Sequence, residues 1–103
     1  MVLTLTKEGF LVHSTDWSED VALTLAKVEG ITLTTAHWDI LHFIRRYYET
    51  YQYLPNTRVF IKLIATEFGV EKGNSRYLQG LFPQSPLKKA CKLAGLPKPP
   101  TCL

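Results

Sequence analysis

The C-terminal stretch of this 103-residue chain constrains its fold more than any other stretch. Gly95 is followed by three prolines, Pro97, Pro99 and Pro100. Glycine commonly ends a helix, and proline lacks the backbone N–H that a further helical turn needs. Residues 96–103 are therefore predicted to form an extended arm outside any helix, in the geometry that proline-rich segments adopt.

The penultimate residue of that arm, Cys102, is one of only two cysteines in the chain. A thiol at the end of an arm has no core to fill, which favours a chemical role. The seven residues after Gly95 span up to about 23 Å, at about 3.3 Å each. That reach lets the thiol enter the binding site of another protein or return towards the other cysteine, Cys91.

The sequence leaves two interpretations of Cys91 open. It shares the helical spacing of Leu87 and Ala94, so it suits a core position as a small apolar residue. A redox role as a second thiol is equally consistent with the pattern.

The chemistry that suits Cys102 is the transfer of sulfur from a persulfide. Such exchange needs access and a thiolate, and an ordinary thiol has a pKa of about 8.5. The positive charges of Lys92 and Lys98 would lower the pKa of Cys102, whereas the adjacent terminal carboxylate would raise it. We predict that Cys102 accepts sulfur and then offers it to a further acceptor.

The bulk composition predicts one globular domain, residues 1–103, with 46% hydrophobic and 20% charged residues. No apolar run approaches the roughly 20 residues of a membrane span, so no membrane partner is expected. The first residues lack the pattern of a signal peptide, and the cytoplasm is the expected location. Thiols are kept reduced there, which favours carrier or redox chemistry over a structural disulfide.

Residues 1–13 are predicted to form a small β-hairpin. Apolar residues alternate loosely on both sides of Lys7-Glu8-Gly9, where a tight turn fits. A hairpin alone is marginally stable in water, so it is expected to pack on the helices that follow.

Residues 14–95 are predicted to form an array of about five short helices, each with apolar residues at helical spacing. The expected starts carry capping residues: Ser14-Thr15-Asp16, Thr34 or Thr35, Asn56-Thr57, Asn74-Ser75 and Ser85-Pro86. The expected ends carry glycine or proline: Gly30, Pro55, Gly69, Pro83 and Gly95.

The net charge of +3 hides a division between the two halves of the chain. Up to Pro55 there are four Lys/Arg and seven Asp/Glu, and from Asn56 onward there are eight and two. A basic half attracts an acidic protein face or a nucleic acid. A loose helix-turn-helix pattern makes a small DNA-binding regulator a distant alternative, with four candidate phosphate contacts: Arg58, Lys62, Lys72 and Arg76.

No metal or cofactor is expected. The three histidines, His13, His37 and His42, do not have the spacing of a zinc site, and neither do the two cysteines. No group of acid, base and nucleophile is visible either, so turnover of a small molecule by the chain alone is not expected.

Several segments carry a specific pattern: Lys-Gly-Asn-Ser-Arg-Tyr-Leu at 72–78, Leu-Phe-Pro at 81–83, Ala-Cys-Lys-Leu-Ala-Gly-Leu-Pro-Lys-Pro at 90–99, and the penultimate Cys102. His-Trp-Asp-Ile at 37–40 and Pro55 with Arg58 belong to the same pattern. The chain resembles the DsrC/TusE family over nearly its whole length. That family comprises the gamma subunit of dissimilatory sulfite reductase and the sulfur-relay protein TusE.

The resemblance implies an α+β, mostly helical fold, with a small N-terminal β-hairpin packed on an orthogonal array of about five helices and a C-terminal arm. It implies that Cys102 carries the sulfur. In TusE-like members this residue accepts sulfur from the TusBCD complex and passes it towards MnmA, which thiolates the wobble uridine of certain tRNAs. Arg58 matches an arginine of the family that is expected to steady the arm.

In DsrC-like members a second cysteine, matched here by Cys91, joins the first in a disulfide or trisulfide during sulfite reduction with the αβ subunits of the reductase. This chain departs from the usual pattern at Asn56, at Ser85 and at the ending Thr101-Cys102-Leu103. The ending favours the TusE role, whereas the presence of Cys91 favours the DsrC role. We predict a sulfurtransferase that works as a relay component, with the DsrC role as the alternative.

Overall fold

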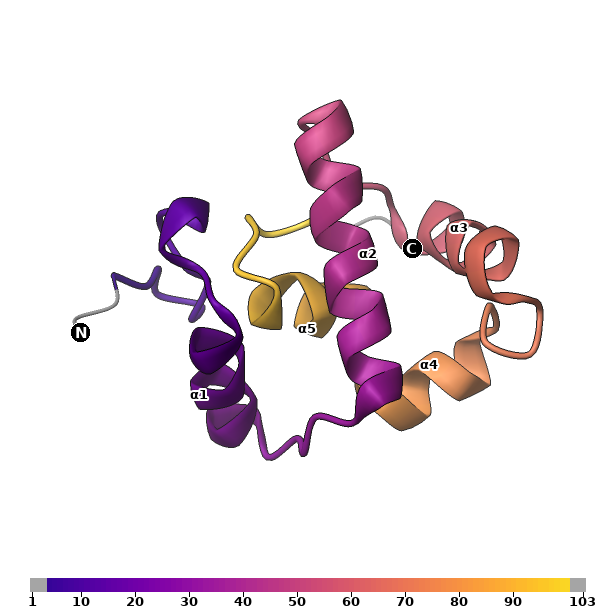
Figure 1. Ribbon diagram of the computed structural model, residues 1–103, viewed down its shortest axis with the longest axis horizontal. Helices are drawn as coiled ribbons and strands as arrows, with labels where there is room; N and C mark the ends of the chain where they lie inside the picture. Colours follow the sequence, from indigo (N-terminus) through magenta and orange to yellow (C-terminus); the bar gives the residue numbers. More distant parts are fainter. Residues whose placement is uncertain (1–3, 101–103) are drawn as a thin grey trace.

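The computed structural model describes residues 4–100. The regular elements of this part of the chain are all helices: a short 3₁₀ helix, η1 (Ser14–Asp16), precedes α1 (Glu19–Glu29), α2 (Thr35–Tyr51), α3 (Thr57–Phe68), α4 (Ser75–Leu81) and α5 (Pro86–Leu93). Figure 1 shows α5 in the middle of the molecule, with α1 on one side, α3 and α4 on the other, and α2 crossing in front of it.

The predicted N-terminal β-hairpin of residues 1–13 is wrong, and with it the α+β class. Residues 4–100 contain no strand, and one isolated antiparallel bridge joins Leu5 and Leu11. The turn lies where it was expected, because the N–H of Gly9 donates to the carbonyl of Thr6 at 2.9 Å. Among the described residues the pairing continues as far as Val12, whose N–H donates to the carbonyl of Thr4 at 2.9 Å, and η1 begins two residues later at Ser14. One bridged pair is too little for a sheet.

Each helix from α1 to α4 begins at a polar residue that caps it. The Asn56 Oδ1 accepts from the backbone N–H of Val59 at 2.9 Å, as the capping pattern predicts. The cap of α1 was placed too early, because Ser14–Asp16 form η1 and the hydroxyl of Ser18 caps α1 instead. Helix α5 begins with Ser85 and a proline at its first position, as predicted.

The cap of α2 also gives a structural role to His37. The backbone N–H of Thr34 donates to His37 Nδ1 at 3.1 Å, and His37 Nε2 lies 2.8 Å from the carbonyl oxygen of Leu81. Because Nδ1 accepts a hydrogen bond, the ring proton must be on Nε2, which donates to Leu81. The buried histidine therefore joins the start of α2 to the end of α4.

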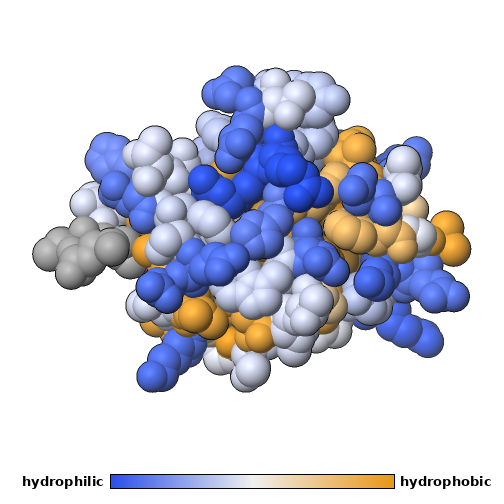
Figure 2. Space-filling view, viewed as in Figure 1, coloured by the Kyte–Doolittle hydropathy of each residue, from blue (hydrophilic) through white to orange (hydrophobic). Residues whose placement is uncertain are grey.

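The core is built around α5, which contacts α1, α2, α3 and α4. Five of its eight residues are buried, among them Leu87, Ala90 and Leu93. The largest fully buried side chains around it come from the other elements: Phe10, Phe60, Phe82, Ile40, Leu41, Ile44, Ile64 and Leu78. Figure 2 shows the face seen in this view covered mostly by hydrophilic residues, with apolar residues in separate groups.

Two properties of residues 4–100 bear on function. None of the helices is long and apolar enough to cross a membrane. Within the same residues, no group of three His, Cys, Asp or Glu side chains is arranged to hold a metal ion.

Candidate functional site

The arm begins directly at the C-terminal end of the central helix. Residues 96–100 form neither helix nor strand, as the prolines predict. Two of them, Leu96 and Pro99, are nevertheless buried, and the N–H of Leu96 donates to the carbonyl of Cys91 at 3.0 Å. The first part of the arm therefore packs on the body of the molecule, and Figure 1 shows it passing behind α2 towards the start of α3.

Cys102, the predicted sulfur carrier, lies outside the described residues together with Thr101 and Leu103. Its role as the sulfur-bearing thiol stays a prediction. Two described features bear on this role: the course of the arm up to Pro100, and the position of the other cysteine, Cys91.

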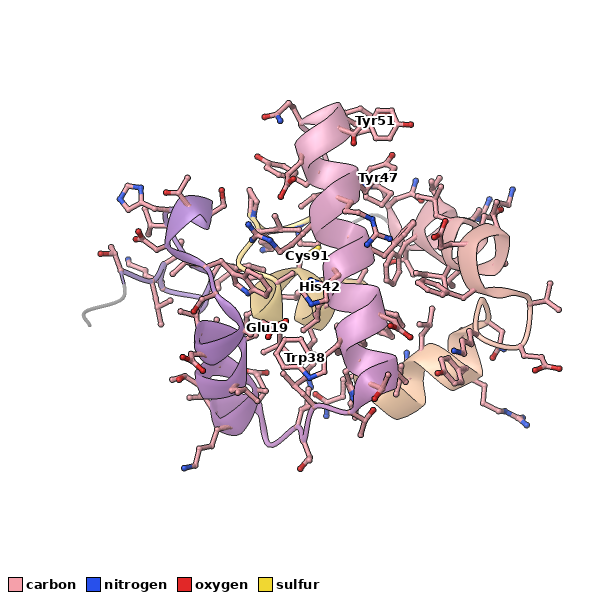
Figure 3. The ribbon with its side chains drawn as sticks, in the orientation of Figure 1. Glu19, Trp38, His42, Tyr47, Tyr51 and Cys91 are labelled. Carbon is pink, nitrogen blue, oxygen red and sulfur yellow. The ribbon has the colours of Figure 1, made fainter. Side chains whose placement is uncertain are left out.

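Cys91 is a free thiol sealed inside the core. Its exposed fraction is 0%, and it lies on α5 between Ala90 and Lys92 (Figure 3). Burial raises the pKa of the Cys91 thiol far above its ordinary value, because a thiolate would lose its hydration there. A protonated, inaccessible thiol is neither a nucleophile nor a sulfur acceptor. In this conformation Cys91 occupies the core position that its helical spacing allows.

Both lysines that were expected to stabilise a thiolate are paired with carboxylates. Lys98 Nζ lies 3.0 Å from Glu8 Oε1, and Lys92 Nζ lies 3.5 Å from Glu29 Oε2. The hydrogen bond from Lys98 lowers the pKa of Glu8, which keeps that carboxylate charged. Each lysine therefore offers a thiolate less net positive charge than the sequence suggested.

Arg58, predicted to steady the arm, is exposed in the first turn of α3. Its neighbour Thr57 lines a hollow of about 410 Å³ together with Pro99 and Pro100. The structure thus brings the start of α3 to the side of the arm. Among the residues that the structure describes, the others lining this hollow include two lysines and no carboxylate: Gln79, Gln84, Ser85, Pro86, Leu87, Lys88 and Lys98.

No sequence pattern predicts the contacts that hold the root of the arm. The indole Nε1 of Trp17 donates to the carbonyl of Leu93 at 2.8 Å, and Arg45 Nη1 donates to the carbonyl of Ala94 at 2.7 Å. The partners are 76 and 49 positions apart in the chain, so local patterns could not pair them. Gly95, in contrast, was recognisable as the end of the helix.

The geometry gives little support to the helix-turn-helix alternative. Helix α4, which would be the recognition helix, has seven residues and a length of about 10 Å. Arg58, Lys62 and Arg76 are exposed, but Lys72 turns its amino group towards the ring of Phe68, at 5.9 Å from the centroid. A short helix with few outward polar side chains is a poor reader of base edges.

Comparison with known proteins places this geometry in context. The family model described as "DsrC like protein" matches residues 1–103. The "Sulfurtransferase TusE homolog" of Haemophilus influenzae is 52% identical over 97 residues, which cover 94% of this chain and 89% of that protein. The "Sulfurtransferase TusE" of Escherichia coli is 48% identical over 96 residues, which cover 93% of this chain and 88% of that protein.

Solved structures show the same arrangement of the chain. The NMR structure of Allochromatium vinosum DsrC has a TM-score of 0.90 and 48% identity, covering 98% of this chain and 90% of that one. The crystal structure of the oxidized gamma-subunit of the dissimilatory sulfite reductase (DsrC) from Archaeoglobus fulgidus has a TM-score of 0.85 and 40% identity, covering 98% and 92%.

Proposed function

The chain belongs to the family of DsrC-like proteins and is a sulfurtransferase of a sulfur relay, and on that premise we propose that it carries sulfur as a persulfide on Cys102. The observation that supports this assignment is the burial of the other thiol. Cys91 is completely buried, and its burial raises its pKa. Because Cys91 is enclosed by the core, we propose that Cys102, at the end of the arm, is the thiol that takes part in sulfur transfer.

The transfer step is a thiol exchange that needs no external oxidant or reductant. The thiolate of Cys102 attacks the terminal sulfur of a donor's persulfide. A bond forms between Cys102 Sγ and that sulfur, the donor's S–S bond breaks, and the donor leaves as a thiolate. The persulfide on Cys102 then gives its outer sulfur to the acceptor, and Cys102 returns to a thiol.

We propose a TusBCD-like complex as the donor and an MnmA-like tRNA thiouridylase, with its tRNA, as the acceptor. The name TusE of the sulfurtransferases at about 50% identity supports this choice. The cytoplasm is the compartment that we propose, because a working thiol must be kept reduced between cycles. We propose that three basic residues steady the arm and its persulfide: Arg58, Lys92 and Lys98. The two lysines take this role once the donor or the acceptor replaces their present carboxylate partners.

The alternative is a DsrC-like partner of the sulfite reductase αβ subunits that uses Cys102 and Cys91 together. The similarity to structures titled DsrC favours it. It requires the last turn of α5 to release Cys91 from the core, since a disulfide needs the two Cα atoms within about 7 Å and both sulfurs accessible.

Intact-mass spectrometry tests the carrier assignment directly. After incubation with a cysteine desulfurase and the relay donor, wild type and Cys91→Ala are expected to gain the mass of one sulfur atom. Cys102→Ser is expected to gain none, because no accessible thiol remains. Treatment with dithiothreitol serves as the control, since it should remove the added mass from a persulfide.

A sulfur atom that stays on Cys102→Ser would contradict the assignment. Loss of uptake in Cys91→Ala, with the fold intact by circular dichroism, would favour the two-thiol alternative instead.

A further inference from the structure

We propose that Trp17 and Arg45 are positioning residues of sulfur transfer, because they hold the root of the arm, residues 93–95, and so determine where the Cys102 thiol is presented. The inference rests on the proposed carrier function of Cys102. Both side chains act through the backbone of the arm root, to which they donate hydrogen bonds.

The first observation is that both residues bind the last carbonyls of α5. The final carbonyls of a helix have no partner within the helix. Here the indole N–H of Trp17 donates to Leu93 at 2.8 Å, and the guanidinium of Arg45 donates to Ala94 at 2.7 Å. Leu93 and Ala94 are fully buried, so water cannot replace either donor without opening the structure.

The second observation is that the two donors hold each other. The guanidinium carbon of Arg45 lies 4.3 Å from the centroid of the Trp17 ring, a cation–π contact. The Arg45 side chain is only 17% exposed, and its burial lowers the pKa of the guanidinium, an effect that Glu49 partly offsets. The partly buried cation therefore depends on the Ala94 carbonyl, on the Trp17 ring and on Glu49 at 4.0 Å.

The third observation is the fit of Gly95 against Trp17. Gly95 has a φ of +71°, in the left-handed region, and a Cβ built on it would lie 2.5–2.8 Å from side-chain atoms of Trp17. The indole thus covers the residue at which the chain leaves the helix. The arm direction is set by the left-handed backbone of Gly95 and by the ring that packs on it.

The arm acts as a lever on this root once it extends off the body, on which Leu96 and Pro99 pack in this structure. Cys102 is seven residues beyond Gly95, so in the extended arm it lies up to about 23 Å away. A rotation of about 10° at the root moves the end of such a lever by about 4 Å. Misplacement of a reacting group by about 1 Å can cost about 100-fold in rate, so a loose root should slow transfer without weakening the docking of a partner.

The chain offers matched variants for the test. Arg45→Met and Trp17→Phe remove the two donors while keeping much of the side-chain volume. Arg46→Met and Trp38→Phe are the controls, because Arg46 is an exposed neighbour whose ion pair is with Glu67, and Trp38 stacks on His42. Folding of all four is checked by circular dichroism and urea unfolding. Arg45→Lys replaces Arg45→Met should the latter fail to fold, with a smaller change expected in the same direction.

The first measurement uses the chain alone, in a Cys102→Ser background, so that Cys91 is the sole cysteine. The rate at which iodoacetamide alkylates Cys91 in the folded protein is followed by mass spectrometry. Loosening the end of α5 should raise that rate by about ten-fold or more, because local opening exposes groups that the intact root protects. Arg46→Met and Trp38→Phe should match the parent.

The second measurement uses the persulfide-loaded donor complex and variants with Cys102 intact. With concentrations normalised to titrated Cys102, kcat for sulfur transfer should fall by about ten-fold in Arg45→Met and Trp17→Phe, with KM within about two-fold of wild type. The folded fraction of each variant, measured by circular dichroism, corrects kcat for any loss of folded protein, because the thiol titration also counts unfolded chains.

An unchanged alkylation rate of Cys91, or an unchanged kcat, in both variants overturns the inference. A wild-type protein that takes up no sulfur overturns the proposed function instead. The two failures are distinguishable, because the alkylation of Cys91 involves neither the donor nor Cys102.

Discussion

At the scale of single residues, the two cysteines have separate assignments. Cys91 is enclosed by α5 and its neighbours, with an exposed fraction of 0%, and Ala90, Leu93 and Ala94 beside it are equally buried. The sequence left this residue between a core position and a redox role, because a small apolar side chain and a working thiol obey the same helical spacing. Only the packing of other helices on α5 decides in favour of the core in this conformation.

The buried thiol predicts a pH dependence of stability. Burial raises the pKa of Cys91 above the value of about 8.5 that an ordinary thiol has, so above that pH the unfolded chain releases a proton that the folded chain retains. The stabilisation is therefore complete below about pH 8.5 and is lost as the pH rises. Between about pH 8 and about pH 10, wild type should lose about 2 kcal/mol more unfolding free energy than Cys91→Ala.

Urea unfolding at the two pH values measures this difference. Every other titrating group, Cys102 included, is shared by the two proteins and largely cancels in the comparison. Equal pH slopes for wild type and Cys91→Ala would mean that the thiol is not sealed in the folded protein.

At the scale of elements, the positions of the helices followed from local chemistry. Asn56 caps α3 and Asn74 caps α4, where the sequence predicted new helices to begin. Asn74 does more than cap: its Oδ1 accepts from the N–H of Tyr77 at 2.8 Å, and its Nδ2 donates to the carbonyls of Val70 and Glu71 at 3.1 and 2.8 Å. It thereby joins the turn after α3 to α4.

These two asparagines make a matched pair of variants. Asn56→Ala should cost about 1 kcal/mol of unfolding free energy, the usual value of a lost N-cap. Asn74→Ala should cost about 2 kcal/mol, because the hydrogen bonds to the preceding turn are lost as well. Chemical denaturation compares the two. Equal losses would show that the contacts of Asn74 with Val70 and Glu71 contribute nothing.

The failure at the N-terminus shows the limit of element prediction. The turn at Lys7-Glu8-Gly9 was recognisable from its residues, yet the flanks form one bridge between Leu5 and Leu11. Alternation of apolar residues indicates which side chains face the core, and Phe10 and Leu11 are indeed buried. It does not indicate whether enough backbone is hydrogen-bonded to make a strand.

At the scale of the whole molecule, contacts between distant segments determine how the arm leaves the body. Trp17, in the loop before α1, and Arg45, on α2, bind the end of α5. The acidic first half also meets the basic second half, at Glu8 with Lys98 and at Glu29 with Lys92. The unequal distribution of charge along the sequence thus allows ion pairs within the protein as well as contacts with any partner. Local sequence patterns contain none of these contacts. They led to the prediction of a thiol on an arm, which stays a prediction, and they could not predict the contacts that hold the root of that arm.

The dimensions of the molecule suit a thiol that visits other proteins. The described residues extend over 38 × 28 × 21 Å, and α5 lies in their middle. An arm of up to about 23 Å that starts beside α5 is long enough to place its end beyond the surface of the body. The proposed carrier role therefore requires no unfolding of the core.

The relay itself is tested most directly by following one sulfur atom through the protein. Cys91→Ala is loaded with radioactive sulfur from the donor complex, purified, and mixed with the tRNA thiouridylase, tRNA, ATP to activate the uridine oxygen as a leaving group, and an excess of unlabelled donor. We predict that the label moves to the tRNA at the wild-type rate, because the sulfur travels on Cys102 alone. Label that stays on the protein, or leaves it only as free sulfide while the tRNA acquires unlabelled sulfur, would contradict the carrier role.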